Sequence, residues 1–270
     1  MTGRLPEKVA IVFGGGCSEK GISNGGAAAV AFAREGASVA VVDVDLGAAR
    51  RTVEMISTER GNAIALQADV TSLAQIRSAV QQAIDAYGKI DILYNNVGIN
   101  RPGGPVEMEE EIWDTVIETN IKSLFLTCKA VIPVFQKNGG GSIVNVSSIT
   151  GVAWHGRPTI AYSSSKAAVN QFTRAVAAQY GQENIRCNAI LVGSINTPRA
   201  AGQLTSAYSG NAEEMLRQRE ASVPLRRLGT PWEIGSVAVF LASDDASYVT
   251  GAVLPVDGGL TCAVPHPVQG

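Results

Sequence analysis

Seven short runs of aliphatic and β-branched residues recur along the chain, and segments with helical spacing separate them. The runs are continuous in their apolar character, which is typical of strands buried on both faces of a parallel sheet. Strands are expected at 9–13, 38–43, 63–67, 90–94, 142–146, 185–190 and 252–256. Helices are expected at 27–36, 46–60, 72–87, 110–137, 160–180 and 231–242. This alternation predicts an α/β fold, a doubly wound Rossmann domain in three layers around a parallel sheet of about seven strands.

The length and charge of the chain limit its organisation and its partners. A chain of 270 residues suits one α/β domain with its own core. Its net charge of -2 provides no basic field for nucleic acid or for an anionic membrane. No stretch approaches the roughly 20 apolar residues that span a bilayer. We therefore expect a single domain over residues 1–270 and no nucleic-acid or membrane partner.

Cysteine and histidine are too few and too scattered to suggest a metal centre. The two histidines, His155 and His266, rule out a multi-histidine site, so no metal is expected. The four cysteines form no C-x-x-C pair, and scattered reduced thiols fit a cytoplasmic protein. They are Cys17, Cys128, Cys187 and Cys262.

One segment breaks the alternation of strands and helices. Residues 197–224 are polar and rich in Ala, Gly and Ser, with one helical piece near 212–220. So long an insertion in a compact domain predicts a lid over the substrate. The tail, 262–270, contains two prolines, and we expect it to be irregular and to reach a neighbouring subunit.

A glycine-rich stretch, FGGGCSEKGISNGG at 13–26, follows the first predicted strand. Such a turn before a helix cradles phosphate. The stretch lacks the lysine of a nucleoside triphosphatase loop, and Glu19 stands where G-x-G-x-x-G requires a third glycine. By itself it is equally compatible with a flexible surface loop.

The second predicted strand ends in Asp43, beside that turn. A carboxylate there accepts hydrogen bonds from the adenosine ribose hydroxyls and repels a 2′-phosphate, which favours NAD over NADP. Asp43 could instead cap the helix that begins at Leu46, a role that Asp45 could fill equally well.

Tyr162 and Lys166 lie four residues apart in a helical segment, so their side chains share one face. A free tyrosine has a pKa of about 10, and a nearby ammonium lowers it by stabilising the phenolate. The pair can then move a proton to or from an alcohol oxygen. The same spacing also occurs by chance on helical surfaces.

Further motifs agree with this pair, and together they resemble the short-chain dehydrogenase/reductase family from about Lys8 to Thr261. They are ADV (68–70), YNNVG (94–98), ETNIKSLFL (118–126), SIVNVSSITG (142–151), IRCNAILVGSINTP (185–198), PLRRLGTPWEIGSVAVFLASDDASYVTG (224–251) and VDGG (256–259). The resemblance implies a Rossmann oxidoreductase with a nicotinamide cofactor.

The resemblance also implies roles for four catalytic residues. Tyr162 is the proton-transferring acid/base, and Lys166 assists it while holding the nicotinamide ribose. Ser148 donates a hydrogen bond to the substrate oxygen, where charge develops. Asn120 holds a helix distortion and a water that links Lys166 to solvent.

Cofactor contacts are implied in the same way. Asp69 and Val70 would contact the adenine, and Asn96 and Gly98 would contact the adenosine ribose. Gly193, Ile195 and Thr197 would contact the nicotinamide carboxamide. In the first turn, Gly14, Ser23 and Gly25 take the places of the three family glycines, with about five extra residues in 16–22. Ser23 and Asn24 would present N–H groups and a hydroxyl to the pyrophosphate. Lys20 is expected in solvent.

A few positions depart from the family pattern. Phe13 replaces a threonine, Val97 an alanine and Val192 a proline, and the loop between Ser148 and Tyr162 is one residue longer than usual. That loop carries Trp154 and His155, so the floor of the substrate site is altered. The four catalytic positions are intact.

The expected function is hydride transfer between NAD(H) and a secondary alcohol or ketone of small to medium, apolar character. Two alternatives stay open: epimerase or dehydratase chemistry through a transient oxidation, and a non-catalytic nucleotide sensor on the same fold. A homotetramer is expected through 110–137 and 160–180. Candidates for the apolar lining, which are equally compatible with core or subunit contacts, are Ile149, Val152, Trp154, Leu191, Leu204 and Tyr208.

Overall fold

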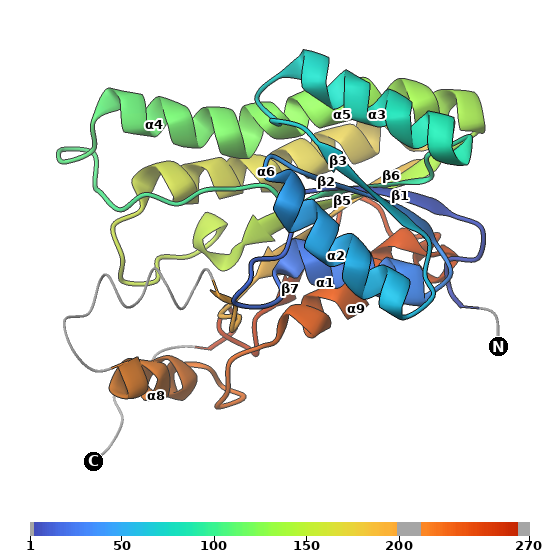
Figure 1. Ribbon diagram of the computed structural model, residues 1–270. Helices are drawn as coiled ribbons and strands as arrows, with labels where there is room; N and C mark the ends of the chain where they lie inside the picture. Colours follow the sequence, from blue (N-terminus) through green and yellow to red (C-terminus); the bar gives the residue numbers. More distant parts are fainter. Residues whose placement is uncertain (1–2, 199–211, 264–270) are drawn as a thin grey trace.

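Seven strands lie side by side in one parallel sheet in the computed structural model, which describes residues 3–198 and 212–263 (Figure 1). Their order across the sheet is β3-β2-β1-β4-β5-β6-β7. The predicted Rossmann fold is therefore confirmed. The strands are β1 (Val9–Phe13), β2 (Ser38–Asp43), β3 (Ala63–Gln67), β4 (Ile92–Asn95), β5 (Gly141–Ser148), β6 (Ile185–Val192) and β7 (Val253–Val256).

The direction of the strand order reverses at β1, which pairs with β2 on one side and with β4 on the other. Val9 of β1 is in register with Ser38, and Ala10 is in register with Ile92. The connections that leave β1 and β4 therefore diverge, and a crevice opens outside the carboxyl ends of these strands. This is where a doubly wound sheet binds ligands.

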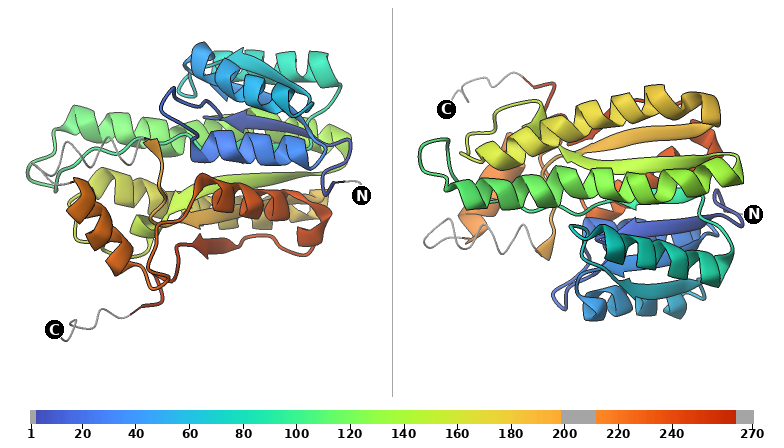
Figure 2. Two further views of the ribbon diagram at one scale, coloured as in Figure 1. Left: turned by 60° about the horizontal axis from the view of Figure 1, so that its bottom comes forward. Right: turned by 90° about the horizontal axis from the view of Figure 1, so that it is seen from above.

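Helices cover both faces of the sheet, as the two views of Figure 2 show. One face packs against α1 (Asn24–Arg34), α2 (Leu46–Thr58) and α9 (Pro231–Ala242). The other packs against α3 (Leu73–Tyr87), α5 (Ser123–Asn138) and α6 (Ile160–Tyr180). Two apolar cores result, one on each side of the sheet.

Strand β1 is apolar along its whole length because it contributes side chains to both cores. Ala10 and Val12 point into one core, and Ile11 and Phe13 point into the other. Side chains alternate between the faces of a strand, so a strand covered on both faces has no polar side. Phe13 is 1% exposed, which makes it a core residue.

Several predicted elements, β4 among them, have bounds that differ by a few residues in the structure, and one predicted helix is divided. The expected helix at 110–137 is divided into α4 (Glu110–Ile117), a π-helical turn η1 (Glu118–Lys122) and α5. The helical piece expected near 212–220 forms α8 (Ala212–Ser222). Residues 199–211, with Leu204 and Tyr208, lie outside the described residues, as do 264–270 with His266. The lid and the reach of the tail therefore stay predictions.

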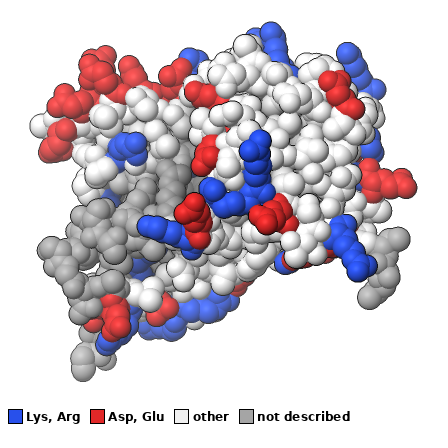
Figure 3. Space-filling view, viewed as in Figure 1, with Lys and Arg blue, Asp and Glu red and all other residues white. Residues whose placement is uncertain are grey.

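The described surface and helices give three further findings. Acidic side chains gather over the beginning of α4, where Glu109, Glu110 and Glu111 are exposed, and both signs of charge are interspersed elsewhere on this face (Figure 3). Within the described ranges, no helix is long and apolar enough to cross a membrane. The same ranges contain no group of three or more His, Cys, Asp or Glu that could hold a metal ion.

Candidate active site

A cleft of about 910 Å³ lies at the carboxyl ends of the strands, where the sheet changes direction. This volume lies within the range of small-molecule sites. Gly25 and Asn120 lie outside its lining. The predicted site residues that line it are Gly14, Ser23, Asn24, Asp43, Asp69, Val70, Asn96, Gly98, Ser148, Tyr162, Lys166, Gly193, Ile195 and Thr197.

The turn after β1 leads into the amino terminus of α1. Gly14 has a φ of +74°, in the left-handed region that favours glycine. Ser23 is the N-cap of α1, and its hydroxyl accepts the N–H of Gly26 at 2.9 Å. The same hydroxyl donates to the Gly16 carbonyl oxygen at 2.8 Å. The Ser23 hydroxyl is therefore engaged inside the turn, whereas the sequence suggested that it faces the pyrophosphate.

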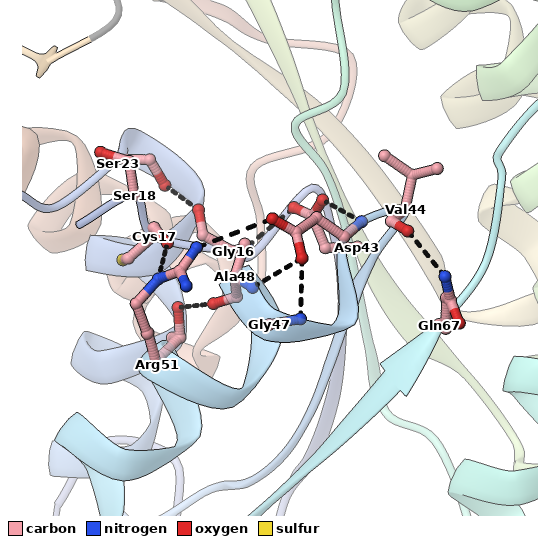
Figure 4. Close-up of polar contacts among 12 residues, drawn as sticks. Gly16, Cys17, Ser18, Ser23, Asp43, Val44, Gly47, Ala48, Arg51 and Gln67 are labelled. Atoms are coloured by element: carbon pink, nitrogen blue, oxygen red, sulfur yellow. Dashed lines mark hydrogen bonds and ion pairs between the residues drawn. The ribbon is translucent and has the colours of Figure 1, made fainter. Parts of the chain in front are cut away.

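The extra residues of this turn are built onto α2 (Figure 4). The N–H of Cys17 donates to the Ala48 carbonyl oxygen at 3.1 Å. Arg51 donates from Nε to the Cys17 carbonyl oxygen at 2.8 Å. Thr52 donates from its hydroxyl to the Gly15 carbonyl oxygen at 2.7 Å. Lys20 is exposed at the rim of the cleft.

Asp43 is held at the end of β2 by two backbone donors. Its Oδ2 accepts the N–H of Gly16 at 3.0 Å, and its Oδ1 accepts the N–H of Asp45 at 3.1 Å (Figure 4). Asp45 caps α2 by accepting the N–H groups of Gly47 and Ala48. Capping is thus the role of Asp45. Because each carboxylate oxygen has two lone pairs, Asp43 retains capacity for a ligand in the cleft.

Hydrogen bonds also fix the neighbouring cofactor candidates. Asn96, after β4, donates from Nδ2 to the Gly14 carbonyl oxygen at 2.8 Å, which joins the two strands across the change of direction. Asp69 accepts the N–H and the hydroxyl of Thr71, each at 2.8 Å. Gly193 donates its N–H to the Val256 carbonyl oxygen at 3.0 Å.

Helix α6 carries Tyr162 and Lys166 into the cleft. Lys166 is only 3% exposed, and its Nζ donates to the Val146 carbonyl oxygen at 2.8 Å. The same Nζ lies 5.6 Å from the centre of the Tyr162 ring. A positive charge at this distance favours the ionised form of a phenol. Ser148, at the end of β5, lies in the same cleft and accepts hydrogen bonds from the N–H and hydroxyl of Thr150.

Asn120 lies in the π-helical turn η1 and is 2% exposed. It exchanges hydrogen bonds with the backbone of Ile99, accepting at 2.7 Å and donating at 2.9 Å. Its Nδ2 also donates to the Ser165 hydroxyl at 2.9 Å. The widened turn thus ties the segment after β4 to α6, next to Lys166. The helix distortion expected at Asn120 is present.

The cleft has features that fit a dinucleotide. The Oδ1 atoms of Asn24 and Asn100 are buried in its lining and have no hydrogen-bond partner among the residues that the structure describes. Close approach leaves no room for a side chain at Gly25, where a Cβ would overlap the Gly14 carbonyl oxygen. At Gly98 a Cβ would make a tight contact, 3.1 Å from Lys166 Nζ.

The apolar candidates for the substrate lining lie elsewhere. Ile149 and Leu191 are buried, whereas Val152 and Trp154 are 56% and 72% exposed, and none of these four lines the cleft. Val97, which replaces the usual alanine, packs close to Gly14, because a Cβ at Gly14 would lie 2.9 Å from its Cγ2.

Several lining residues were missed by the sequence reasoning. Arg51 and Arg219 are the clearest cases, and both line the cleft. Arg51 belongs to the helix expected at 46–60, for which the sequence predicted no contact with the cleft. Arg219 belongs to the polar segment 197–224. Neither arginine belongs to a short motif, so only the folding of α2 and α8 around the cleft reveals them.

Comparisons with known proteins agree with this site. The model of a family described as enoyl-(acyl carrier protein) reductase matches residues 15–261. A 2,5-dichloro-2,5-cyclohexadiene-1,4-diol dehydrogenase from Sphingobium indicum is 37% identical over 98% of this chain and 100% of its own length. A 3-oxoacyl-(acyl-carrier-protein) reductase from Thermotoga maritima is 39% identical over 95% of this chain and 99% of its own.

A solved structure gives the same answer for the fold. A protein from Burkholderia xenovorans assigned to the short-chain dehydrogenases/reductases superposes with a TM-score of 0.93, at 40% identity, over 97% of this chain and 100% of that one. The resemblance inferred from the motifs is thereby confirmed. The chain belongs to the short-chain dehydrogenase/reductase family of oxidoreductases, which use a nicotinamide cofactor.

Proposed function

We propose that this protein transfers a hydride between NAD(H) and a secondary alcohol or ketone. The observation that supports it best is the single cleft that contains Ser148, Tyr162 and Lys166 together with the turn after β1. The nicotinamide, when bound, would supply or accept the hydride. The residues of the chain would hold the reactants and carry the proton.

The proton chemistry would be carried by three side chains. Tyr162 exchanges a proton with the substrate oxygen, and the ammonium of Lys166, 5.6 Å from the ring centre, favours the ionised phenol. Ser148 donates a hydrogen bond to the same oxygen and stabilises its developing charge. Asn120, through Ile99 and Ser165, fixes the backbone beside Lys166.

NAD is proposed over NADP because of the charge at the end of β2. Asp43 lines the cleft, and its carboxylate would repel a 2′-phosphate while accepting hydrogen bonds from ribose hydroxyls. Arg51 lies nearby, but its guanidinium is committed to the Cys17 carbonyl oxygen and lies 3.7 Å from Asp45. The negative charge of Asp43 should therefore affect the choice between NAD and NADP more strongly than the positive charge of Arg51.

The names of related proteins support the substrate class. A relative from Xanthobacter autotrophicus, 37% identical over 97% of this chain, is a 2-(S)-hydroxypropyl-CoM dehydrogenase. The hydroxypropyl group in this name and the dichlorocyclohexadiene diol of the Sphingobium relative are secondary alcohols. The 3-oxoacyl group of the Thermotoga relative is a ketone. We therefore propose this functional group as the reacting part of the substrate.

Assembly and location are proposed on more general grounds. Large apolar side chains are exposed on α4 and α5, where Ile112 is 38% and Phe125 is 49% exposed, and burying them would favour a homotetramer. All four cysteines are free thiols, which supports a reducing, cytoplasmic environment.

Turnover tests the proposal directly. Purified protein is assayed with a panel of secondary alcohols and ketones with NAD(H) and NADP(H), by the nicotinamide absorbance. We expect turnover with NAD(H), and a loss of about 100-fold or more in kcat for Tyr162→Phe. Tyr180→Phe, at the other end of the same helix, is the control and should keep full activity. An active Tyr162→Phe, or a wild type that is inactive with the whole panel, would contradict the proposal.

A further inference from the structure

The Arg219 guanidinium belongs to the same cleft as the reacting groups. Arg219 lies near the end of α8, is only partly exposed, and lines the cleft with Ser148 and Tyr162. In both views of Figure 2, α8 lies beyond the carboxyl ends of the strands, at the end of the molecule where α6 begins. The Arg219 cation therefore lines the same cleft as Tyr162.

Among the residues that the structure describes, this cation has no acidic partner. In the described ranges, no ion pair or side-chain hydrogen bond joins the Arg219 guanidinium to another residue. Residues 199–211 and 264–270 contain no aspartate or glutamate. Arg217, on the same helix, differs, because it is exposed and lies 3.8 Å from Glu213. A half-buried guanidinium without a carboxylate is costly, because it has lost part of its hydration.

Burial lowers the pKa of Arg219, and the positive charge of Arg157 lowers it further. Arg157 is exposed and lies outside the lining of the cleft, so of these two arginines only Arg219 lines the cleft.

We propose that Arg219 binds an anionic group of the substrate. This inference rests on the proposed function and narrows it to secondary alcohols or ketones that carry a carboxylate, sulfonate or phosphate. An anion beside the Arg219 guanidinium compensates its partly buried charge and accepts charge-assisted, bidentate hydrogen bonds from it. The apolar substrate that the sequence suggested is replaced by an acidic one, because the four described apolar candidates lie outside the cleft lining.

A phosphate of the cofactor is the other source of negative charge. The dinucleotide phosphates are expected at the amino terminus of α1, with Ser23 and Asn24. Helix α8, which carries Arg219, lies instead at the end of the molecule where α6 begins (Figure 2). We therefore assign the anion to the substrate, and the experiment separates the two sources.

The test compares keto acids with their neutral esters. The wild type is assayed with NADH for reduction of acetoacetate, 4-oxopentanoate and 5-oxohexanoate and of their methyl esters. We expect at least one acid to be preferred over its ester in kcat/KM. Arg219→Gln should lower that preference by about 10- to 100-fold, mainly through KM, because one charge-assisted contact is lost. Arg217→Gln should keep the preference.

Two binding measurements separate the possible failures. The affinity of Arg219→Gln for NADH is measured by fluorescence, and a loss as large as that for the acid would assign Arg219 to a cofactor phosphate and overturn the proposal. Calorimetry on Tyr162→Phe, with and without Arg219→Gln, reports binding of the preferred acid without turnover. Arg219-dependent binding in a protein whose wild type has no activity would support the anion site and contradict the proposed function alone. If no acid is preferred over its ester, the anion site is wrong.

Discussion

Gly16 donates its backbone N–H to Asp43 Oδ2 at 3.0 Å. Gly16 belongs to the lengthened turn after β1, which is the longest departure from the family pattern, and Asp43 is the residue proposed to select the cofactor. The hydrogen bond holds the turn and the Asp43 carboxylate in place. Gly16 has no room for a side chain here, because a Cβ would lie 2.6 Å from the same carboxylate oxygen. The extra residues of the turn therefore do not displace Asp43. They contribute a donor that orients its carboxylate beside the cleft.

Asp43→Ala should shift the cofactor preference toward NADP. Removing the carboxylate removes both the ribose acceptor and the repulsion of a 2′-phosphate. We expect the ratio of kcat/KM for NADP⁺ to that for NAD⁺ to rise by about tenfold or more, as one charge interaction of about 1.4 kcal/mol corresponds to a factor of ten. Steady-state kinetics with both cofactors measures this ratio.

Asp45→Ala is the matched control for that experiment. Asp45 caps α2 through Gly47 and Ala48, so its loss should lower the free energy of unfolding by about 1 kcal/mol. The cofactor ratio should stay that of the wild type. If both variants changed the ratio equally, a general effect of charge or of folding would explain it, and the assignment of Asp43 would be wrong.

Gly25→Ala should destabilise the protein and weaken cofactor binding. A Cβ there would overlap the Gly14 carbonyl oxygen and lie 2.6 Å from Asn96 Nδ2, so α1 or the turn must move and the Asn96–Gly14 hydrogen bond is strained. We expect a loss of about 1–3 kcal/mol in urea denaturation, with weaker NADH binding. Gly181→Ala is the control, because the space around Gly181 is open and its φ is -61°. Equal effects of both substitutions would refute the packing role of Gly25.

Asn145→Ala should be among the more damaging polar substitutions in the sheet. Asn145 is 0% exposed, accepts from Asn95 Nδ2 at 3.0 Å and donates to the Thr173 hydroxyl at 3.0 Å. Truncation leaves the buried Asn95 Nδ2 without its acceptor, at about 1–3 kcal/mol, and removes one of the two hydrogen bonds of the Thr173 hydroxyl, which still donates to the Val169 carbonyl oxygen. Urea denaturation should show this loss, whereas Asn62→Ala, which breaks one exposed bond to Ser38, should change stability by less than about 1 kcal/mol. Similar values for the two variants would contradict this account.

Glu233 should make the protein less stable in acid. Its hydrogen bond with Arg227, assisted by the N–H of Thr230, lowers the pKa of Glu233 to about 2, below its ordinary value of 4.5. A depressed carboxyl pKa contributes stability that is complete above pH 4.5 and is lost as the pH falls through about 2. Both side chains are exposed, so solvent screens the pair and its contribution to stability at neutral pH is small.

Glu233→Gln tests this contribution. The variant should be less stable than the wild type at about pH 7, and the difference should shrink by about pH 3, where the wild-type carboxylate begins to be protonated. Urea denaturation at the two values measures it. Arg227→Met should reproduce the effect. A difference between Glu233→Gln and the wild type that does not depend on pH would show that the ion pair is not its source.

Much of the site follows from local sequence rules. Four residues make one helical turn, so Tyr162 and Lys166 had to share a face of α6. Asp43 ends a strand next to β1, so it had to lie at the carboxyl edge of the sheet. The bounds of β4 and the division of 110–137 were missed, because the π-helical turn is held by Asn120 bonds to Ile99 and Ser165, which are distant in sequence.

By itself the sequence determined the family, the order of the strands along the chain and the residues that share a helical face. These properties depend on hydrophobic periodicity and on motifs that are local in the chain. Tertiary structure alone decided that the Ser23 hydroxyl turns inward, that Arg51 binds the extra residues of the turn, and that Arg219 reaches the cleft. Each of these depends on contacts between segments far apart in sequence, whose partners no spacing along the chain specifies.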